Sequence, residues 1–117
     1  MGIKIIGTGK YLPEKVITNE DISQHVDTSH EWILDRTGIE QRRIATTESS
    51  LDMAAAAAEQ ALQGIDKDSI GLVVVATITP DNITPSMAAM VKKELGLERA
   101  IAFDINAACS GFVYGLW

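Results

Sequence analysis

The chain has a single cysteine, Cys109, which lies where a predicted strand meets a predicted helix. Ile101, Phe103 and Ile105 alternate with smaller or polar residues over a run too short for a helix, which indicates a strand. The residues around the cysteine are small: Ala107, Ala108, Ser110 and Gly111. A helix that begins here would leave free N–H groups and the positive end of its dipole beside the sulfur, and both favour the thiolate. The pattern therefore predicts a cysteine nucleophile at neutral pH.

A structural role for Cys109 is the alternative. A lone cysteine among alanines often acts as a small buried hydrophobic residue that fills a tight contact and has no access to substrate. Solvent access to the sulfur and a helix that starts beside it distinguish the two interpretations.

A second group with chemical potential lies on a predicted short helix. Thr28 and Glu31 have the spacing of a capping box, and Gly38 is a typical helix stop, so we expect the helix to end near Arg36. Trp32 and Arg36 are four residues apart and share a face. An adenine ring could stack on the indole while the guanidinium binds a phosphate. The alternative is a simple cation–π contact between the two side chains.

The elements that must position these groups alternate between strands and helices. Residues 3–7 and 38–44 have the pattern of short strands, and residues 18–26 that of a short helix with Thr18 at its cap. The β-branched run over residues 70–77 is typical of a strand that is buried on both faces and runs parallel to its neighbours.

Two longer helices complete the predicted layout. One spans residues 51–63, with a cap in 49–52 and a stop at Gly64, and the other starts at Thr84 as cap and ends at Gly96. We therefore predict an α/β fold with a mostly parallel sheet, which places ligands at the carboxyl ends of its strands. Cys109 follows one such end.

Composition excludes several classes of function. The chain has 117 residues, 46% of them hydrophobic, which is enough for one globular domain, and its net charge of −6 argues against a nucleic-acid surface. One cysteine excludes an internal disulfide framework, and we find neither a signal peptide nor a membrane span. We expect a cytoplasmic protein, and we assign no metal ligands.

Several short motifs occur together in one order and spacing. They are Ile-Ile-Gly-Thr-Gly at 5–9, Tyr-Leu-Pro at 11–13, Asn19, Thr-Ser at 28–29, Glu-Trp-Ile at 31–33, Arg-Thr-Gly-Ile at 36–39, Arg43, Val-Val-Ala-Thr at 74–77, Pro-Ser at 85–86, Ala-Phe-Asp at 102–104 and Ala-Ala-Cys-Ser-Gly-Phe at 107–112. With them the chain resembles, over its whole length, the N-terminal part of β-ketoacyl-acyl carrier protein synthase III. That family consists of thiolase-fold condensing enzymes that start fatty-acid synthesis.

The resemblance implies an acyltransferase in which Cys109 takes the acyl group from a short acyl-coenzyme A. The acyl-cysteine then condenses with malonyl-acyl carrier protein, which loses carbon dioxide, to give a β-ketoacyl-acyl carrier protein. It also implies that Thr28, Trp32 and Arg36 bind coenzyme A, that no cofactor is needed, and that the complete enzyme is a homodimer. Thr84 stands where relatives often carry an aromatic residue that enters the partner's acyl pocket, although a helix cap explains this threonine equally well.

The resemblance also indicates that residues 1–117 are only part of such a domain. The family's catalytic histidine and asparagine, a glycine of its oxyanion hole and a second adenine-flanking arginine all lie beyond residue 117. We therefore expect a piece of a longer or cleaved protein, with exposed apolar faces and no activity alone. An acidic carrier protein would need a basic surface that this net-negative chain lacks.

Two other functions remain open. One is another thiolase-superfamily acyl-transfer enzyme that makes a secondary metabolite or a signalling compound with the same cysteine. The other is a non-catalytic fragment that binds coenzyme A or a partner chain.

Overall fold

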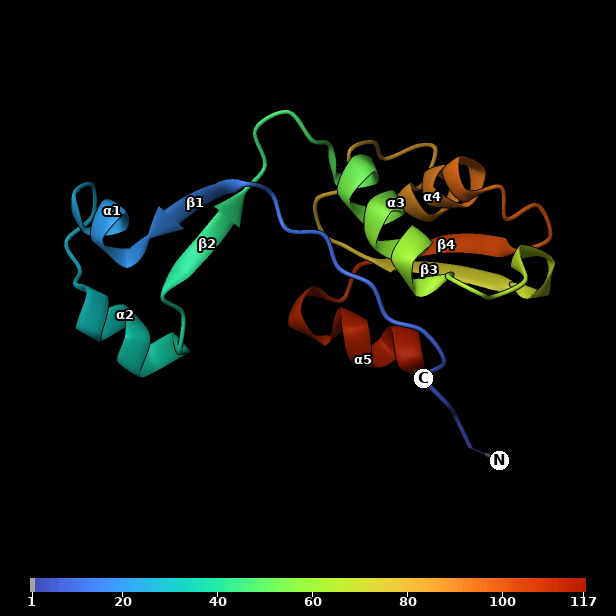
Figure 1. The fold of residues 1–117 in the computed structure, drawn as a ribbon, viewed down its shortest axis with the longest axis horizontal. Helices are drawn as coiled ribbons and strands as arrows, with labels where there is room; N and C mark the ends of the chain where they lie inside the picture. Colours follow the sequence, from blue (N-terminus) through green and yellow to red (C-terminus); the bar gives the residue numbers. More distant parts are fainter. Residues whose placement is uncertain (1) are drawn as a thin grey trace. The chain divides into compact units, whose positions relative to one another are not determined.

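The computed structural model describes residues 2–117, and these form two compact units (Figure 1). The larger unit comprises residues 2–11 and Ser49–Trp117, and the smaller unit comprises Leu12–Glu48. Cys109 lies in the larger unit, whereas Trp32 and Arg36 lie in the smaller one.

The larger unit is built on a pair of parallel strands, β3 and β4, with Val74 opposite Phe103. Helices α3 and α4 lie on one face of this pair and α5 lies on the other (Figure 1). In chain order its elements are α3 (Ser50–Ala61), the 3-10 turn η1 (Lys67–Ser69), β3 (Leu72–Ala76), α4 (Met87–Leu95), β4 (Ile101–Ile105), the 3-10 turn η2 (Ala108–Ser110) and α5 (Gly111–Leu116). The predicted strand–helix alternation with parallel pairing is confirmed.

The core of the larger unit lies between helices α3 and α4 and the face of the strands that they cover. Its buried residues are Met87, Val91, Leu95, Leu97 and Ala100. The alanines of α3 pack against this cluster, since their small side chains let the helix approach closely. The opposite face of the strands is covered only in part, by α5: Leu72, Ile101 and Phe103 are 52%, 70% and 46% exposed. The prediction that residues 70–77 are buried on both faces is therefore wrong for the described chain.

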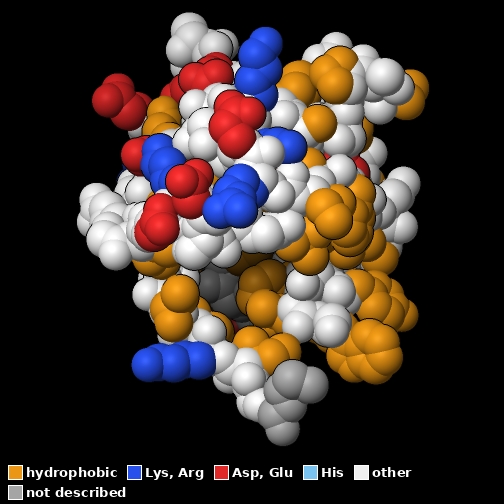
Figure 2. Space-filling view, turned by 90° about the vertical axis from the view of Figure 1, so that its right-hand side faces the viewer, with side chains coloured by type: hydrophobic (Ala, Val, Ile, Leu, Met, Phe, Trp, Pro, Cys, Tyr) orange, Lys and Arg blue, Asp and Glu red, His pale blue; other side chains and the backbone are white. Residues whose placement is uncertain are grey.

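Hydrophobic side chains are accordingly prominent on the surface. Figure 2 shows one face on which they gather around a hollow, while charged side chains gather above it. The exposed large hydrophobic residues of the larger unit include Ile3, Ile5, Ile6, Leu72, Ile101, Phe103, Phe112, Leu116 and Trp117. Such extensive apolar exposure is typical of surfaces that pack against another chain or segment.

The predicted cap of helix α3 is confirmed, although the helix starts one residue earlier and ends two residues earlier than the predicted 51–63. Ser49 accepts a hydrogen bond from the Asp52 amide and the Asp52 carboxylate accepts one from the Ser49 amide, which is a complete capping box. Gly64 adopts a left-handed φ of 74° after the helix.

The start of α4 differs from the prediction. Its cap is Ser86, whose hydroxyl accepts from the Ala89 amide at 3.2 Å, and not Thr84, which lies in the exposed preceding loop. Thr84 and Pro85 both lie before the helix, which begins at Met87, so the cap falls two residues later than the Thr-Pro pattern indicated. The predicted stop at Gly96 is confirmed, with φ at 67°.

Residues 3–7 form no strand in the described structure, contrary to the prediction. The chain at Gly7 and Gly9 instead passes directly along α3. A Cβ atom on Gly7 would meet the carbonyl oxygen of Ala61, and one on Gly9 would meet that of Ala57. Both glycines are therefore explained by close approach to helix backbone.

The smaller unit is an antiparallel strand pair with two helices. Its elements are β1 (Lys15–Thr18), α1 (Asn19–Ser23), α2 (His30–Thr37) and β2 (Gln41–Ile44), with Lys15 opposite Ile44. Strand β2 and a helix capped by Thr18 were predicted, although α1 ends at Ser23. Strand β1 was not predicted.

Asn19 joins the elements of this unit. It is fully buried, its side-chain NH₂ donates to the carbonyl of Ile39 at 2.7 Å, and its side-chain oxygen accepts from Arg42 at 2.6 Å. Its backbone N–H donates to the carbonyl of Glu40 at 3.1 Å. Because a buried amide without partners is costly, this set of bonds fixes the start of α1 against β2.

Candidate active site

Cys109 lies in the turn η2, between the carboxyl end of β4 and the start of α5. Its side chain is exposed and forms no disulfide. The preceding residue, Ala108, has a φ of 44°, a left-handed conformation that costs energy for a residue with a Cβ atom. The structure therefore places the sulfur in a tight, accessible turn, and the interpretation of Cys109 as a buried packing residue does not fit it.

A helix starts close to the sulfur, as predicted. Helix α5 begins at Gly111, and Ser110 at its cap makes no side-chain hydrogen bond to the helix amides. The amides of Ser110 and Gly111 instead donate to the backbone carbonyls of Ala107 and Ala108. At six residues, α5 is short.

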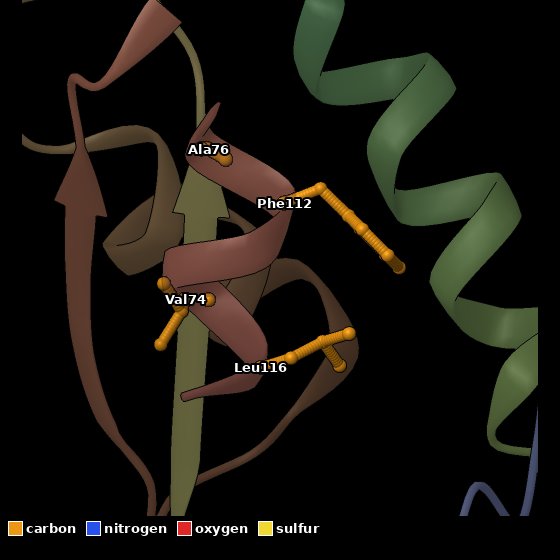
Figure 3. Close-up of a pocket in the computed structure, with 6 residues that line it drawn as sticks. Val74, Ala76, Phe112 and Leu116 are labelled. Atoms are coloured by element: carbon orange, nitrogen blue, oxygen red, sulfur yellow. The ribbon is translucent and has the colours of Figure 1, made fainter. Parts of the chain in front are cut away.

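Gly111 sets the distance between α5 and β3. The residue is buried, and a Cβ atom there would lie 2.8 Å from the Cβ atom of Ala76. Figure 3 shows α5 crossing β3 near Ala76 and Val74, with Phe112 and Leu116 on the same side of the helix. The close approach at Gly111 holds the turn that carries Cys109 against the end of β3.

A pocket of about 360 Å³ opens at this point. It is lined by Ala76, Thr77, Ile78, Thr79, Ala108 and Cys109. Apart from Ala108 and Cys109, its lining thus comes from the end of β3 and the loop that follows. Cys109 lies at the carboxyl ends of two parallel strands, the position at which open α/β sheets bind ligands.

A second, apolar pocket of about 260 Å³ lies between α5 and β3 (Figure 3). Its lining consists of Val74, Ala76, Gly111, Phe112, Gly115 and Leu116. It contains no ionisable group, and of its residues only Ala76 also lines the cysteine pocket.

Trp32 and Arg36 lie together on α2 in the smaller unit. The guanidinium carbon of Arg36 is 4.2 Å from the centre of the Trp32 ring, which confirms the shared face. The indole is 53% exposed. The guanidinium therefore already stacks on the indole, which is the cation–π contact considered above.

The start of α2 differs by one residue from the prediction. Ser29, and not Thr28, is the cap, and its hydroxyl accepts from the Trp32 amide at 3.1 Å. The Thr28 hydroxyl is buried and has no hydrogen-bond partner among the described residues. The pKa of Glu31 is lowered, first by a hydrogen bond from its own backbone N–H and then by the Ser29 hydroxyl. The spacing of Thr28 and Glu31 thus pointed to the wrong one of two adjacent hydroxyl residues.

Two carboxylates of the larger unit were missed by the sequence analysis. Asp104 on β4 accepts hydrogen bonds from the amides of Met87 and Ala88, at 2.8 and 2.7 Å, and so caps α4. Asp81 accepts from the amides of Ser50 and Leu51, at 3.1 and 2.8 Å, at the start of α3. No short-range pattern marks either bond, because donor and acceptor are 16 to 31 residues apart.

Among residues 2–117 no group of three or more His, Cys, Asp or Glu side chains is arranged to hold a metal ion. No helix in this range is long and apolar enough to cross a membrane.

Comparison with known proteins shows which proteins this chain resembles. No family model matches the chain. It is 50% identical over 116 residues to β-ketoacyl-[acyl-carrier-protein] synthase III of Clostridium acetobutylicum and 52% identical to that of Clostridium botulinum strain Loch Maree. Each alignment covers 97% of this chain and 36% of the relative, so the chain spans about a third of the length of these curated relatives.

Solved structures agree with the curated relatives. The crystal structure of 3-oxoacyl-[acyl-carrier-protein] synthase III from Aquifex aeolicus has a TM-score of 0.91 and 50% identity, and the match covers 98% of this chain and 38% of that one. The priming β-ketosynthase of the R1128 polyketide pathway has a TM-score of 0.88 and 40% identity, with 97% and 35% covered. In sequence and fold the chain is thus similar to about one third of these β-ketoacyl-[acyl-carrier-protein] synthase III proteins, and it has the thiolase-like fold that its sequence motifs indicated.

Proposed function

We propose that this chain supplies the acyl-accepting cysteine of an initiating condensing enzyme in type II fatty-acid synthesis. In this proposal residues 1–117 are the N-terminal portion of one thiolase-like domain. The observation that carries the proposal is the exposed Cys109 in its pocket at the carboxyl ends of β3 and β4. The names of the relatives support the choice of reaction.

The first step is transfer of an acyl group between two sulfur atoms. The Cys109 thiolate attacks the carbonyl carbon of an acyl-coenzyme A thioester, and the tetrahedral intermediate expels the coenzyme A thiolate. The backbone N–H of Cys109 donates to the oxyanion that forms. No cofactor takes part, since acyl-coenzyme A is a substrate.

The second step forms a carbon–carbon bond. Malonyl-acyl carrier protein loses carbon dioxide, and the resulting carbanion attacks the acyl-cysteine carbonyl. The product is a β-ketoacyl-acyl carrier protein, and Cys109 leaves as a free thiolate. The groups that promote decarboxylation come from outside this chain.

The smaller unit binds coenzyme A in this proposal. The exposed face of Trp32 stacks on adenine, Arg36 pairs with a phosphate, and Thr28 donates its hydroxyl near the base. Arg36 already stacks on Trp32, so binding requires only one side of the indole to be open. The unpartnered Thr28 hydroxyl supports a hydrogen bond to a ligand, because a buried hydroxyl without any partner is destabilising.

The partners of the complete enzyme are acyl-coenzyme A, malonyl-acyl carrier protein and a second subunit in a cytoplasmic homodimer. Thr84 lies in an exposed loop, in keeping with contact to the partner's acyl pocket. Nucleic acid and membrane have no part in the proposal.

Acylation of Cys109 tests the proposal. The expressed polypeptide that carries this chain is incubated with acetyl-coenzyme A, and intact-mass analysis with peptide mapping locates any adduct. We expect one acetyl group on Cys109 and none in the Cys109→Ser variant. Binding of coenzyme A without an adduct would instead support the non-catalytic function.

A second candidate function is priming of a polyketide or related pathway. The 40% identity to the R1128 priming β-ketosynthase favours it specifically. The acceptor distinguishes the two candidates: condensation with the malonyl-carrier of fatty-acid synthesis supports the first, and condensation only with a different acceptor supports the second.

A further inference from the structure

The loop between β3 and α4, residues 77–86, forms one wall of the Cys109 pocket. Thr77, Ile78 and Thr79 line the pocket together with Cys109. A reactive thiol needs its substrate held in a fixed geometry, so the position of this wall matters for any acyl transfer at Cys109. The residues that hold the loop in place therefore affect the geometry of the site.

The two ends of the loop are held by β4. At the start, the Thr77 amide donates to the carbonyl of Ile105 at 3.1 Å, which extends the parallel pairing by one bond. At the end, Asp104 accepts from the first two amides of α4. Both contacts belong to the strand that leads to Cys109.

The middle of the loop is held from a different element. The Asp81 carboxylate accepts from the amide of Ser50 with one oxygen and from that of Leu51 with the other, which ties the loop to the start of α3. These bonds lower the pKa of Asp81, the one from Leu51 most. Helix α3 already has a complete cap in Ser49 and Asp52, so its stability does not depend on Asp81 alone.

We propose that Asp81 is a positioning residue for the reaction at Cys109: its bonds to the start of α3 hold Thr77–Thr79 at the pocket wall. This inference rests on the proposed acyl transfer. Asp81 does not touch the sulfur, and it acts only through the loop.

Three variants and one matched control test the inference in the expressed polypeptide. Asp81→Ala removes both bonds, and Asp81→Asn keeps one good acceptor. Ser50→Pro removes one donor from the other side, at the first position of a helix where proline is favoured, and the preceding Ser49 is extended, as proline requires. Ser49→Ala is the control, because it weakens the same helix start without removing the Asp81 bonds.

The readouts are the rate of Cys109 acylation by acetyl-coenzyme A, the rate of alkylation by iodoacetamide, and the melting temperature. We expect acylation to fall about tenfold in Asp81→Ala and less in Asp81→Asn and Ser50→Pro. Alkylation should change less than about twofold, because a small reagent does not need the wall. Ser49→Ala should lower the melting temperature yet keep the wild-type acylation rate.

Different failures have different meanings. If the wild type is alkylated but never acylated, the proposed function is wrong and this inference falls with it. Suppose that the wild type is acylated and that Asp81→Asn, Ser50→Pro and Ser49→Ala are all acylated at the wild-type rate. Asp81 is then only a structural residue. Should Asp81→Ala fail to fold, the other two variants decide.

Discussion

The helices α2 and α5 begin in opposite ways. Helix α2 has Ser29 as a side-chain cap, an acid in its first turn and Gly38 in the left-handed conformation at its end. Helix α5 starts without a side-chain cap and without an acid in its first turn. Just before it, Ala108 has a positive φ. The start of α2 is held by a side-chain cap, whereas at the start of α5 the amides of Ser110 and Gly111 donate only to backbone carbonyls, those of Ala107 and Ala108.

The comparison shows what holds a helix that lacks caps. Helix α5 is fixed by packing, since Gly111 allows it to approach Ala76 on β3. Helix α2 has local hydrogen bonds at both ends, from the Trp32 amide to Ser29 and from the Gly38 amide to Leu34. Substitutions that change packing should therefore affect α5, and substitutions that remove a cap should affect α2.

The largest effect is expected for Gly111→Ala. The backbone of Gly111 is helical, so alanine suits the conformation, but its Cβ atom would lie 2.8 Å from that of Ala76. Overpacking of this kind costs about 1–3 kcal/mol, and the shift of α5 should also slow acylation of Cys109. Urea unfolding and the acylation assay measure the two effects.

Gly115→Ala is the control on the same helix. Its Cβ atom would lie 3.9 Å from Val74, an ordinary contact, and alanine favours helix by about 1 kcal/mol over glycine. Equal destabilisation by both substitutions would show that α5 is not held by the close approach at Gly111.

The next largest effect is expected for Ser29→Ala. Loss of this cap should lower the free energy of unfolding by about 1 kcal/mol, measured by urea denaturation. Ser110→Ala, at the start of α5, should cost much less because Ser110 makes no cap bond. A similar cost at both positions would remove the contrast between the two helices.

A smaller effect is expected for Arg36→Ala. Its stacking on Trp32 is exposed, and such contacts contribute about 0.5–1 kcal/mol. Binding of coenzyme A, measured by calorimetry, should weaken more than stability does if α2 binds the nucleotide. Unchanged binding would argue against this role for α2.

The smallest effect on stability is expected from a change of pH, because stability should change only in acid. The pKa of Glu31 lies below its ordinary value of 4.5, and the pKa values of Asp21 and Asp81 lie below 3.8, chiefly through backbone hydrogen bonds. A lowered native pKa gives stability that is present above the unfolded value and is lost as pH falls through the native one. Urea midpoints should therefore be constant near neutral pH and decrease below pH 4.5, and an increase there would contradict these bonds.

Local patterns predicted much of this fold. Alternation gave β4 and the β-branched run gave β3, and the glycines at 38, 64 and 96 marked helix ends, because each depends on neighbouring residues only. Cys109 was also placed correctly at the carboxyl end of a strand.

Features that depend on distant residues could not be read in this way. The caps from Asp81 and Asp104 join segments far apart in the chain, and residues 3–7 alternate like a strand yet lack a strand partner among the described residues. The caps predicted at Thr28 and Thr84 were wrong, because Ser29 and Ser86 lie close by in the chain and only the backbone path decides which hydroxyl reaches the helix.

Asn19 has a consequence for how the smaller unit loses its structure. One buried side chain bonds to Ile39 and Arg42, so neither the first helix nor the second strand can detach without stranding polar groups of the other. Amide protons of these two elements should therefore exchange with solvent at similar rates, as a single opening event rather than as two.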